Sequence, residues 1–135
     1  MYISTWPGLN PAAILSTSRE ENALPFPLGV RMQTRFFAAR YGIYHLIRTL
    51  LGPEKGTVLV PAYHHGNEVQ AIRAAGASIT FYSIDQNLQP DLKELERLCE
   101  GARILYVIHY MGWPQPLDEL LALCRRAAEV GVRAA

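Results

Sequence analysis

Residues 57–66 have the sequence Thr-Val-Leu-Val-Pro-Ala-Tyr-His-His-Gly, in which an apolar run changes abruptly into a polar and aromatic one. The β-branched and apolar residues 58–60 predict a short buried strand. The strand should end at Pro61, because proline cannot donate a hydrogen bond within a central sheet ladder. Tyr63, His64 and His65 follow, and ligands of open α/β sheets bind beyond the carboxyl ends of the strands. We therefore expect this loop to belong to a functional site.

Helical and extended patterns alternate on both sides of this stretch. Apolar periodicity predicts helices at about residues 40–51, 67–75, 90–100 and 116–130, and strands at 58–60, 78–84 and 103–108. Gly76 and Gly131 are expected to cap two of the helices at their carboxyl ends. Alternating helices and strands imply right-handed crossovers and a parallel sheet. The predicted fold is therefore α/β, with three α-β-α layers and a mostly parallel sheet.

The same periodicity predicts which side chains face the core. In the first helix the expected inward stripe is Ile43, Leu46, Ile47 and Leu50, and in the last helix it is Leu117, Leu120, Leu121 and Cys124. The strand at 103–108 is almost wholly apolar, which is typical of a strand covered on both faces. We expect Asp91 and Glu94 to stabilise the amino end of the third helix, and Asp85 to belong to a polar loop.

Composition and charge exclude several classes of protein. The chain has 135 residues, a net charge of +1 and 19% charged residues, so nothing favours binding to nucleic acid. It contains neither an apolar run long enough to span a membrane nor the pattern of a signal peptide. Cys99 and Cys124 lie far apart in sequence and are interpreted as reduced packing residues, so we expect a cytoplasmic protein. Residues 1–35, rich in proline and glycine, are predicted to form an irregular arm.

No motif for metal binding or nucleophilic catalysis is present. The four histidines are His45, His64, His65 and His109, and their spacing does not predict a metal site. The glycine-rich fingerprints of phosphate and dinucleotide loops are absent, which argues against a free-standing nucleotide-binding domain. The two lysines, Lys55 and Lys93, are expected in a turn and on a polar helix face. Neither position suits a lysine that forms a Schiff base.

Small residues precede the first predicted helix, at Ala38 and Ala39. The free N–H groups and the positive dipole end of a helix suit a phosphate group there. Most helix starts bind nothing, so this observation gains weight only in combination with others.

Four short segments together resemble a known family. Residues 39–44 read Ala-Arg-Tyr-Gly-Ile-Tyr, residues 58–63 read Val-Leu-Val-Pro-Ala-Tyr, residues 76–77 read Gly-Ala, and residues 109–114 read His-Tyr-Met-Gly-Trp-Pro. In this order they resemble the amino-terminal part of the DegT/DnrJ/StrS-type aminotransferases, over roughly residues 36–133. These enzymes carry pyridoxal 5'-phosphate (PLP), have the aspartate aminotransferase-like fold (fold type I), and mostly aminate nucleotide-linked keto-sugars in polysaccharide or secondary-metabolite biosynthesis.

The resemblance implies a set of cofactor-binding residues. The phosphate loop of the family falls on Ala38, Ala39 and Arg40, although the serine or threonine hydroxyl of that loop is missing here. Backbone N–H groups and the Arg40 guanidinium would hold the phosphate. The aromatic residue that stacks on the cofactor ring in the family corresponds to His65.

The family pattern is incomplete in this sequence. The aspartate that pairs with the pyridine nitrogen and the Schiff-base lysine are both absent, as is the small carboxyl-terminal domain. The resemblance therefore implies that residues 36–135 are a truncated part of the large domain, without a catalytic residue and inactive alone. The complete enzyme would act as a homodimer on an amino donor and a keto-sugar. The alternative is a non-catalytic binding or dimerisation module that docks on a full-length homologue.

Overall fold

The computed structural model describes residues 34–133, so the expected irregular arm lies almost entirely outside the described residues. All helices and strands below belong to the compact unit that begins at Phe36. In chain order they are α2 (Ala39–Leu51), β1 (Thr57–Pro61), α3 (Asn67–Ala74), β2 (Ser78–Tyr82), α4 (Leu92–Cys99), β3 (Ile104–Leu105), the 3-10 turn η2 (Tyr110–Gly112) and α5 (Leu117–Arg133).

The three strands form one parallel sheet in the order β2-β1-β3, with β1 at the centre. Thr57 pairs with Ser78, and Leu59 pairs with Leu105. As predicted, β1 ends at Pro61, and the chain leaves the sheet after the Ala62 N–H donates to the Tyr82 carbonyl at 2.8 Å. The prediction of an α/β fold with a parallel sheet is confirmed.

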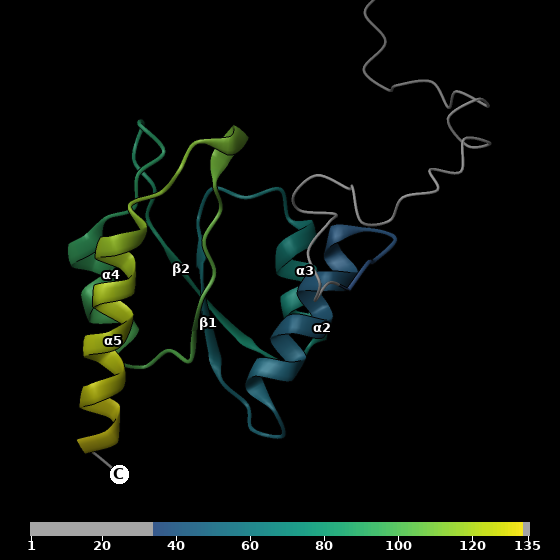
Figure 1. The fold of residues 1–135 in the computed structure, drawn as a ribbon, viewed down its shortest axis with the longest axis horizontal. Helices are drawn as coiled ribbons and strands as arrows, with labels where there is room; N and C mark the ends of the chain where they lie inside the picture. The colour runs from purple at the N-terminus through teal and green to yellow at the C-terminus, as the bar shows by residue number, and fades with distance from the viewer. Residues whose placement is uncertain (1–33, 134–135) are drawn as a thin grey trace, which may run out of the picture. The chain divides into compact units, whose positions relative to one another are not determined.

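Helices cover the sheet on both faces, α2 and α3 on one and α4 and α5 on the other (Figure 1). Successive residues of β1 point to opposite faces of the sheet. Val58 and Val60 therefore pack with Ile47 and Ile72 of α2 and α3. Leu59 instead joins a second core with the following buried residues of β2, α4 and α5: Tyr82, Leu95, Cys99, Leu120 and Leu123.

Local sequence signals at the helix ends are confirmed. Gly76 follows α3 with a φ of 95°, a backbone conformation that glycine adopts without steric cost. The Asp91 carboxylate caps α4 by accepting hydrogen bonds from the Lys93 and Glu94 N–H groups at 2.9 and 3.1 Å. Asp85 holds a polar loop together, because its Oδ1 accepts from the N–H groups of Asn87 and Gln89, both at 2.8 Å.

Three predicted boundaries are wrong. Strand β2 ends at Tyr82 instead of residue 84, and β3 contains only Ile104 and Leu105 instead of residues 103–108. Residues 104–108 are half-buried, because β3 lies at the edge of the sheet and has one neighbouring strand. Gly131 does not cap the last helix, since α5 continues through it to Arg133.

The predicted inward stripes are wrong at several positions. Leu46 and Leu50 of α2 are 58% and 53% exposed, and Leu117 and Leu121 of α5 are 45% and 50% exposed. Ile47 and Leu120 are buried as predicted, and Leu51 and Leu123, which the stripes did not include, are buried as well. A three-stranded sheet is narrow, so only the centre of each apolar stripe reaches it. The flanking leucines remain at the surface.

Candidate functional site

The carboxyl ends of the strands bring two polar loops together, as the parallel order predicts. The first loop follows β1 at Ala62–Gly66, and the second follows β3 and contains η2. The Tyr110 hydroxyl donates a hydrogen bond of 2.7 Å to the Tyr63 carbonyl, and the two rings lie 5.4 Å apart. Tyr110 is buried whereas Tyr63 is exposed. Burial, and then the neighbouring Tyr63, raise the pKa of Tyr110.

The two adjacent histidines of the first loop have different environments. The His64 ring stacks on Phe81 of β2, with ring centres 5.4 Å apart and planes at 8°. Its Nδ1 is buried and has no hydrogen-bond partner in the described part of the chain. His65, which the family resemblance assigns to stacking on the cofactor, is exposed. The structure thus brings His64 and not His65 against another ring.

Glu68 was not predicted as a site residue, yet it lies in the first turn of α3, four residues after His64. Its Oε2 is buried and lacks a hydrogen-bond partner among residues 34–133. Its charge contributes, after burial, to the raised pKa of Tyr106 beyond β3. No signal in the sequence pointed to Glu68, because His64 lies in the loop before α3 and the rule that side chains four residues apart are neighbours holds only within a helix.

The predicted phosphate position lies at the amino end of α2. Ala38 precedes the helix in an extended conformation, and no side chain of the described residues 34–133 caps the first N–H groups. The N–H groups of Ala39 and Arg40 have no acceptor within the helix itself, whereas that of Tyr41 donates to the Ala38 carbonyl at 3.0 Å. The Arg40 guanidinium lies 5.3 Å from the centre of the Tyr41 ring. Ala39 and Arg40 are exposed, so a small anion can reach this position from solvent.

A shallow surface pocket of about 340 Å³ lies between helices α2 and α3, close to this position. It is lined by Arg40, Tyr41, Tyr44, Asn67, Gln70, Ala71 and Ala74. Arg40 and Asn67 each lie in the first turn of their helix, so the amino ends of α2 and α3 are neighbours. His65 does not line this cavity.

His109 and Gln115 stabilise the second loop. The Gln115 N–H donates to His109 Nδ1 at 3.1 Å, and the buried Gln115 amide donates to the Leu88 carbonyl at 2.9 Å. The second contact joins this loop to the loop that follows β2. Met111 and Trp113 project from the same loop and are 98% and 69% exposed.

The two lysines lie away from these loops. Lys55 is in the turn that precedes β1, at the opposite edge of the sheet. Lys93 is in α4 and lines a surface hollow with Glu96 and Glu119. Within residues 34–133, no group of three or more histidine, cysteine or acidic side chains is placed to hold a metal ion.

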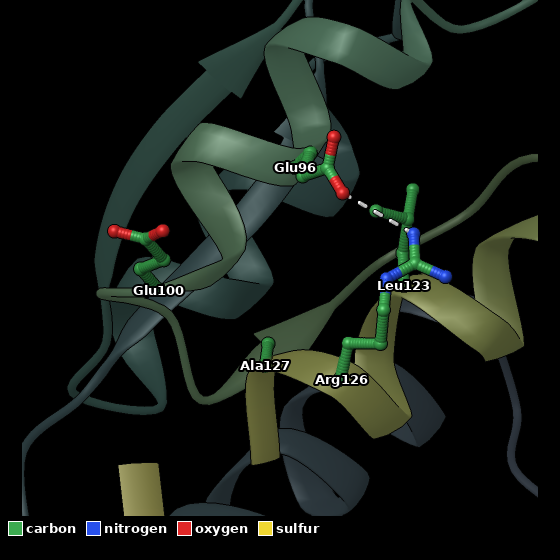
Figure 2. Close-up of a pocket in the computed structure, with 5 residues that line it drawn as sticks. All are labelled: Glu96, Glu100, Leu123, Arg126 and Ala127. Carbon is green, nitrogen blue, oxygen red and sulfur yellow. Dashed lines mark hydrogen bonds and ion pairs between the residues drawn. The ribbon is translucent and has the colours of Figure 1, made fainter. Parts of the chain in front are cut away.

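Another hollow, of about 200 Å³, lies at the seam between α4 and α5 (Figure 2). Arg126 donates a hydrogen bond of 3.3 Å to Glu96 across the seam, and both side chains are more than half exposed. Exposed ion pairs of this kind contribute at most about 1 kcal/mol to stability. This pocket lies at the surface between α4 and α5, and its charged side chains are exposed to solvent.

Comparisons of the chain with protein families, with curated proteins and with solved structures found no match. Among the described helices, none combines the length and the apolar character needed to cross a membrane.

Proposed function

We propose that this chain is part of a PLP-dependent aminotransferase that acts on nucleotide-linked keto-sugars. The proposal is supported by the resemblance of four ordered segments to DegT/DnrJ/StrS-type enzymes, whose aspartate aminotransferase-like large domain is also α/β. The observation that carries it is the shared cavity of Arg40 and Asn67. Two helix amino ends with free N–H groups lie side by side there, which favours a phosphate group.

The described residues fit only the phosphate end of the cofactor. Backbone N–H groups at Ala39 and Arg40, together with the Arg40 guanidinium, can bind a phosphate. No lysine lies at the carboxyl-end loops of the described strands to bind the cofactor aldehyde. The Asp85 carboxylate is already used within its own loop. We therefore assign phosphate binding to Ala38, Ala39 and Arg40. We assign no catalytic residue to this chain.

We expect the purified 135-residue chain to bind pyridoxine 5'-phosphate and to show no transaminase activity. Pyridoxine phosphate lacks the aldehyde of PLP, so reaction with surface lysines does not complicate the measurement. Titration calorimetry should show that pyridoxine without the phosphate binds much more weakly and that inorganic phosphate competes. Arg40→Ala should weaken binding by about 10-fold to 150-fold, because a hydrogen bond to a charged group contributes about 1.5–3 kcal/mol.

Arg73→Ala is the matched control, since Arg73 is exposed in the last turn of α3 and does not line the cavity. It should bind pyridoxine phosphate like the wild type. Equal binding of the ligand with and without its phosphate would contradict the phosphate assignment. Turnover of an amino donor and a keto-sugar by the pure chain would contradict the absence of a catalytic residue.

The second candidate function is a non-catalytic module that docks on a full-length homologue. The observation that favours it is the pair of exposed leucines, Leu46 and Leu50, one turn apart on α2. We expect the chain to form a complex with a full-length DegT/DnrJ/StrS-type enzyme in sedimentation experiments, and Leu46→Asp to abolish that complex. If the two proteins sediment independently, this alternative is wrong.

A further inference from the structure

Cys99 and Cys124 lie 25 positions apart in the chain, yet the fold brings them to one place. Cys99 is the last residue of α4, and Cys124 lies in the first half of α5. Both line a single cavity of about 230 Å³, whose lining also includes Leu59 and Leu105 of the sheet. Cys99 is 7% exposed and Cys124 is half-buried.

The two side chains also interact with each other. Burial is the main cause of the raised pKa of Cys99, and its charge interaction and side-chain hydrogen bonding with Cys124 raise it further. Both cysteines are free thiols in this structure. The Glu96–Arg126 ion pair joins the same two helices less than one turn away (Figure 2).

We propose that Cys99 and Cys124 are a redox-sensitive pair that forms a disulfide bond between α4 and α5. The oxidant is a small-molecule disulfide such as oxidised glutathione. The two thiols line one cavity between α4 and α5, so the bond joins side chains that already face a common space. The bond closes a loop through β3 and η2, and it joins α4 and α5 covalently on one face of the sheet.

The reaction balances as two successive exchanges. The more accessible Cys124 loses its proton, and its sulfur attacks one sulfur of the small disulfide, releasing one small thiol. The Cys99 sulfur then attacks Cys124 in the mixed disulfide and releases the second small thiol. The two protein thiols lose two electrons, which reduce the small disulfide, and their two protons end on the released thiols. Because the thiolate is the nucleophile, the reaction should quicken as the pH rises from about 7 to about 9.

The test is to incubate the reduced, full-length chain with oxidised glutathione, to block the remaining thiols with an alkylating agent and to measure the intact mass. We expect a monomer that has lost two hydrogen atoms and carries no alkyl group. The chain contains two cysteines, so this product can only be the Cys99–Cys124 bond. The oxidised chain should melt several degrees higher than the reduced one, because a disulfide restricts the unfolded chain.

Cys99→Ser and Cys124→Ser are the control variants, and each should stop at a single glutathione adduct or an intermolecular dimer. Circular dichroism checks that they fold. The wild-type measurement decides the proposal even if a variant does not fold. Three results for the wild-type chain would overturn the proposal. These are one glutathione on each cysteine, alkylation of both thiols, or disulfide-linked dimers as the sole product.

Discussion

Leu95→Ala is expected to lower the free energy of unfolding by about 2–5 kcal/mol, the range measured for buried leucines that leave a cavity. Leu95 is 0% exposed and lies where α4 meets the sheet and α5. Its partners in that core include Leu59 of β1 and Leu120 of α5. Alanine is a good helix former, so the loss measures burial and not helix propensity. Since small domains are stable by only about 5–15 kcal/mol, the change is large.

Urea unfolding, extrapolated to water, measures this loss, and an unchanged dependence on urea shows that the unfolding reaction is the same. Leu46→Ala is the matched control, because the same chemical change is made in α2 at a side chain that is 58% exposed. The Leu46→Ala substitution should lower the free energy of unfolding by about 0.5 kcal/mol or less. Equal losses in the two variants would mean that Leu95 is not the buried contact between the layers. Leu95→Val offers a milder change if the alanine variant does not fold.

The contrast between Leu95 and Leu46 also shows how far the sequence predicts the fold. Both leucines belong to apolar helical stripes, and the order of helices and strands follows from such stripes. Local chemistry predicts the ends of elements where one residue decides them, as at Pro61, Gly76 and Asp91. Which leucines are covered depends on the width of the sheet. That width is set by strand pairing between distant segments.

Strand β3, at the edge of the sheet, shows the same limit of prediction from sequence. The apolar sequence of residues 104–108 predicts a strand that is buried on both faces. In the structure, however, only Ile104 and Leu105 pair with β1. A strand with one neighbour has one side of its backbone and part of its side chains uncovered. Nothing local in the sequence distinguishes such a strand from a central one.

The candidate site was predictable in outline and not in detail. The parallel order of strands was sufficient to place the loops after β1 and β3 at one edge. The hydrogen bond from Tyr110 to Tyr63 joins residues 47 positions apart, so no local pattern could reveal it. The position of Cys99 and Cys124 at one cavity depends in the same way on how α4 and α5 pack. His64, and not His65, stacks on Phe81, because the path of the loop decides which of two neighbours turns inward.

Alkaline pH should lower the free energy of unfolding, and Tyr82 is expected to be a main cause. Tyr82 is 3% exposed, and its hydroxyl donates a hydrogen bond of 3.0 Å to the Tyr106 carbonyl. Burial raises the pKa of Tyr82 well above its ordinary value of 10.0, and the neighbouring Tyr110 and Tyr106 raise it further. The folded chain therefore keeps this proton at a pH where the unfolded chain releases it.

The direction of the effect follows from proton binding in the two states. Below pH 10 both states hold the proton, so the stabilising contribution is complete. Above that pH the unfolded state binds fewer protons than the folded state, so the free energy of unfolding falls as the pH rises. For one tyrosine the fall reaches about 1.4 kcal/mol per pH unit. The raised pKa values of Tyr106 and Tyr110 act in the same direction.

Urea unfolding between about pH 8 and about pH 11.5 measures this dependence. Tyr82→Phe removes the ionisable hydroxyl, so its free energy of unfolding should fall less steeply above pH 10 than that of the wild type. At neutral pH the variant should lose about 0.5–1.5 kcal/mol, which is the net value of a hydrogen bond. Tyr41→Phe is the control, because this side chain is 45% exposed and lies in α2, away from Tyr82, Tyr106 and Tyr110, so the variant should keep the wild-type slope. If Tyr82→Phe and the wild type decline in parallel, the buried hydroxyl does not link protonation to folding.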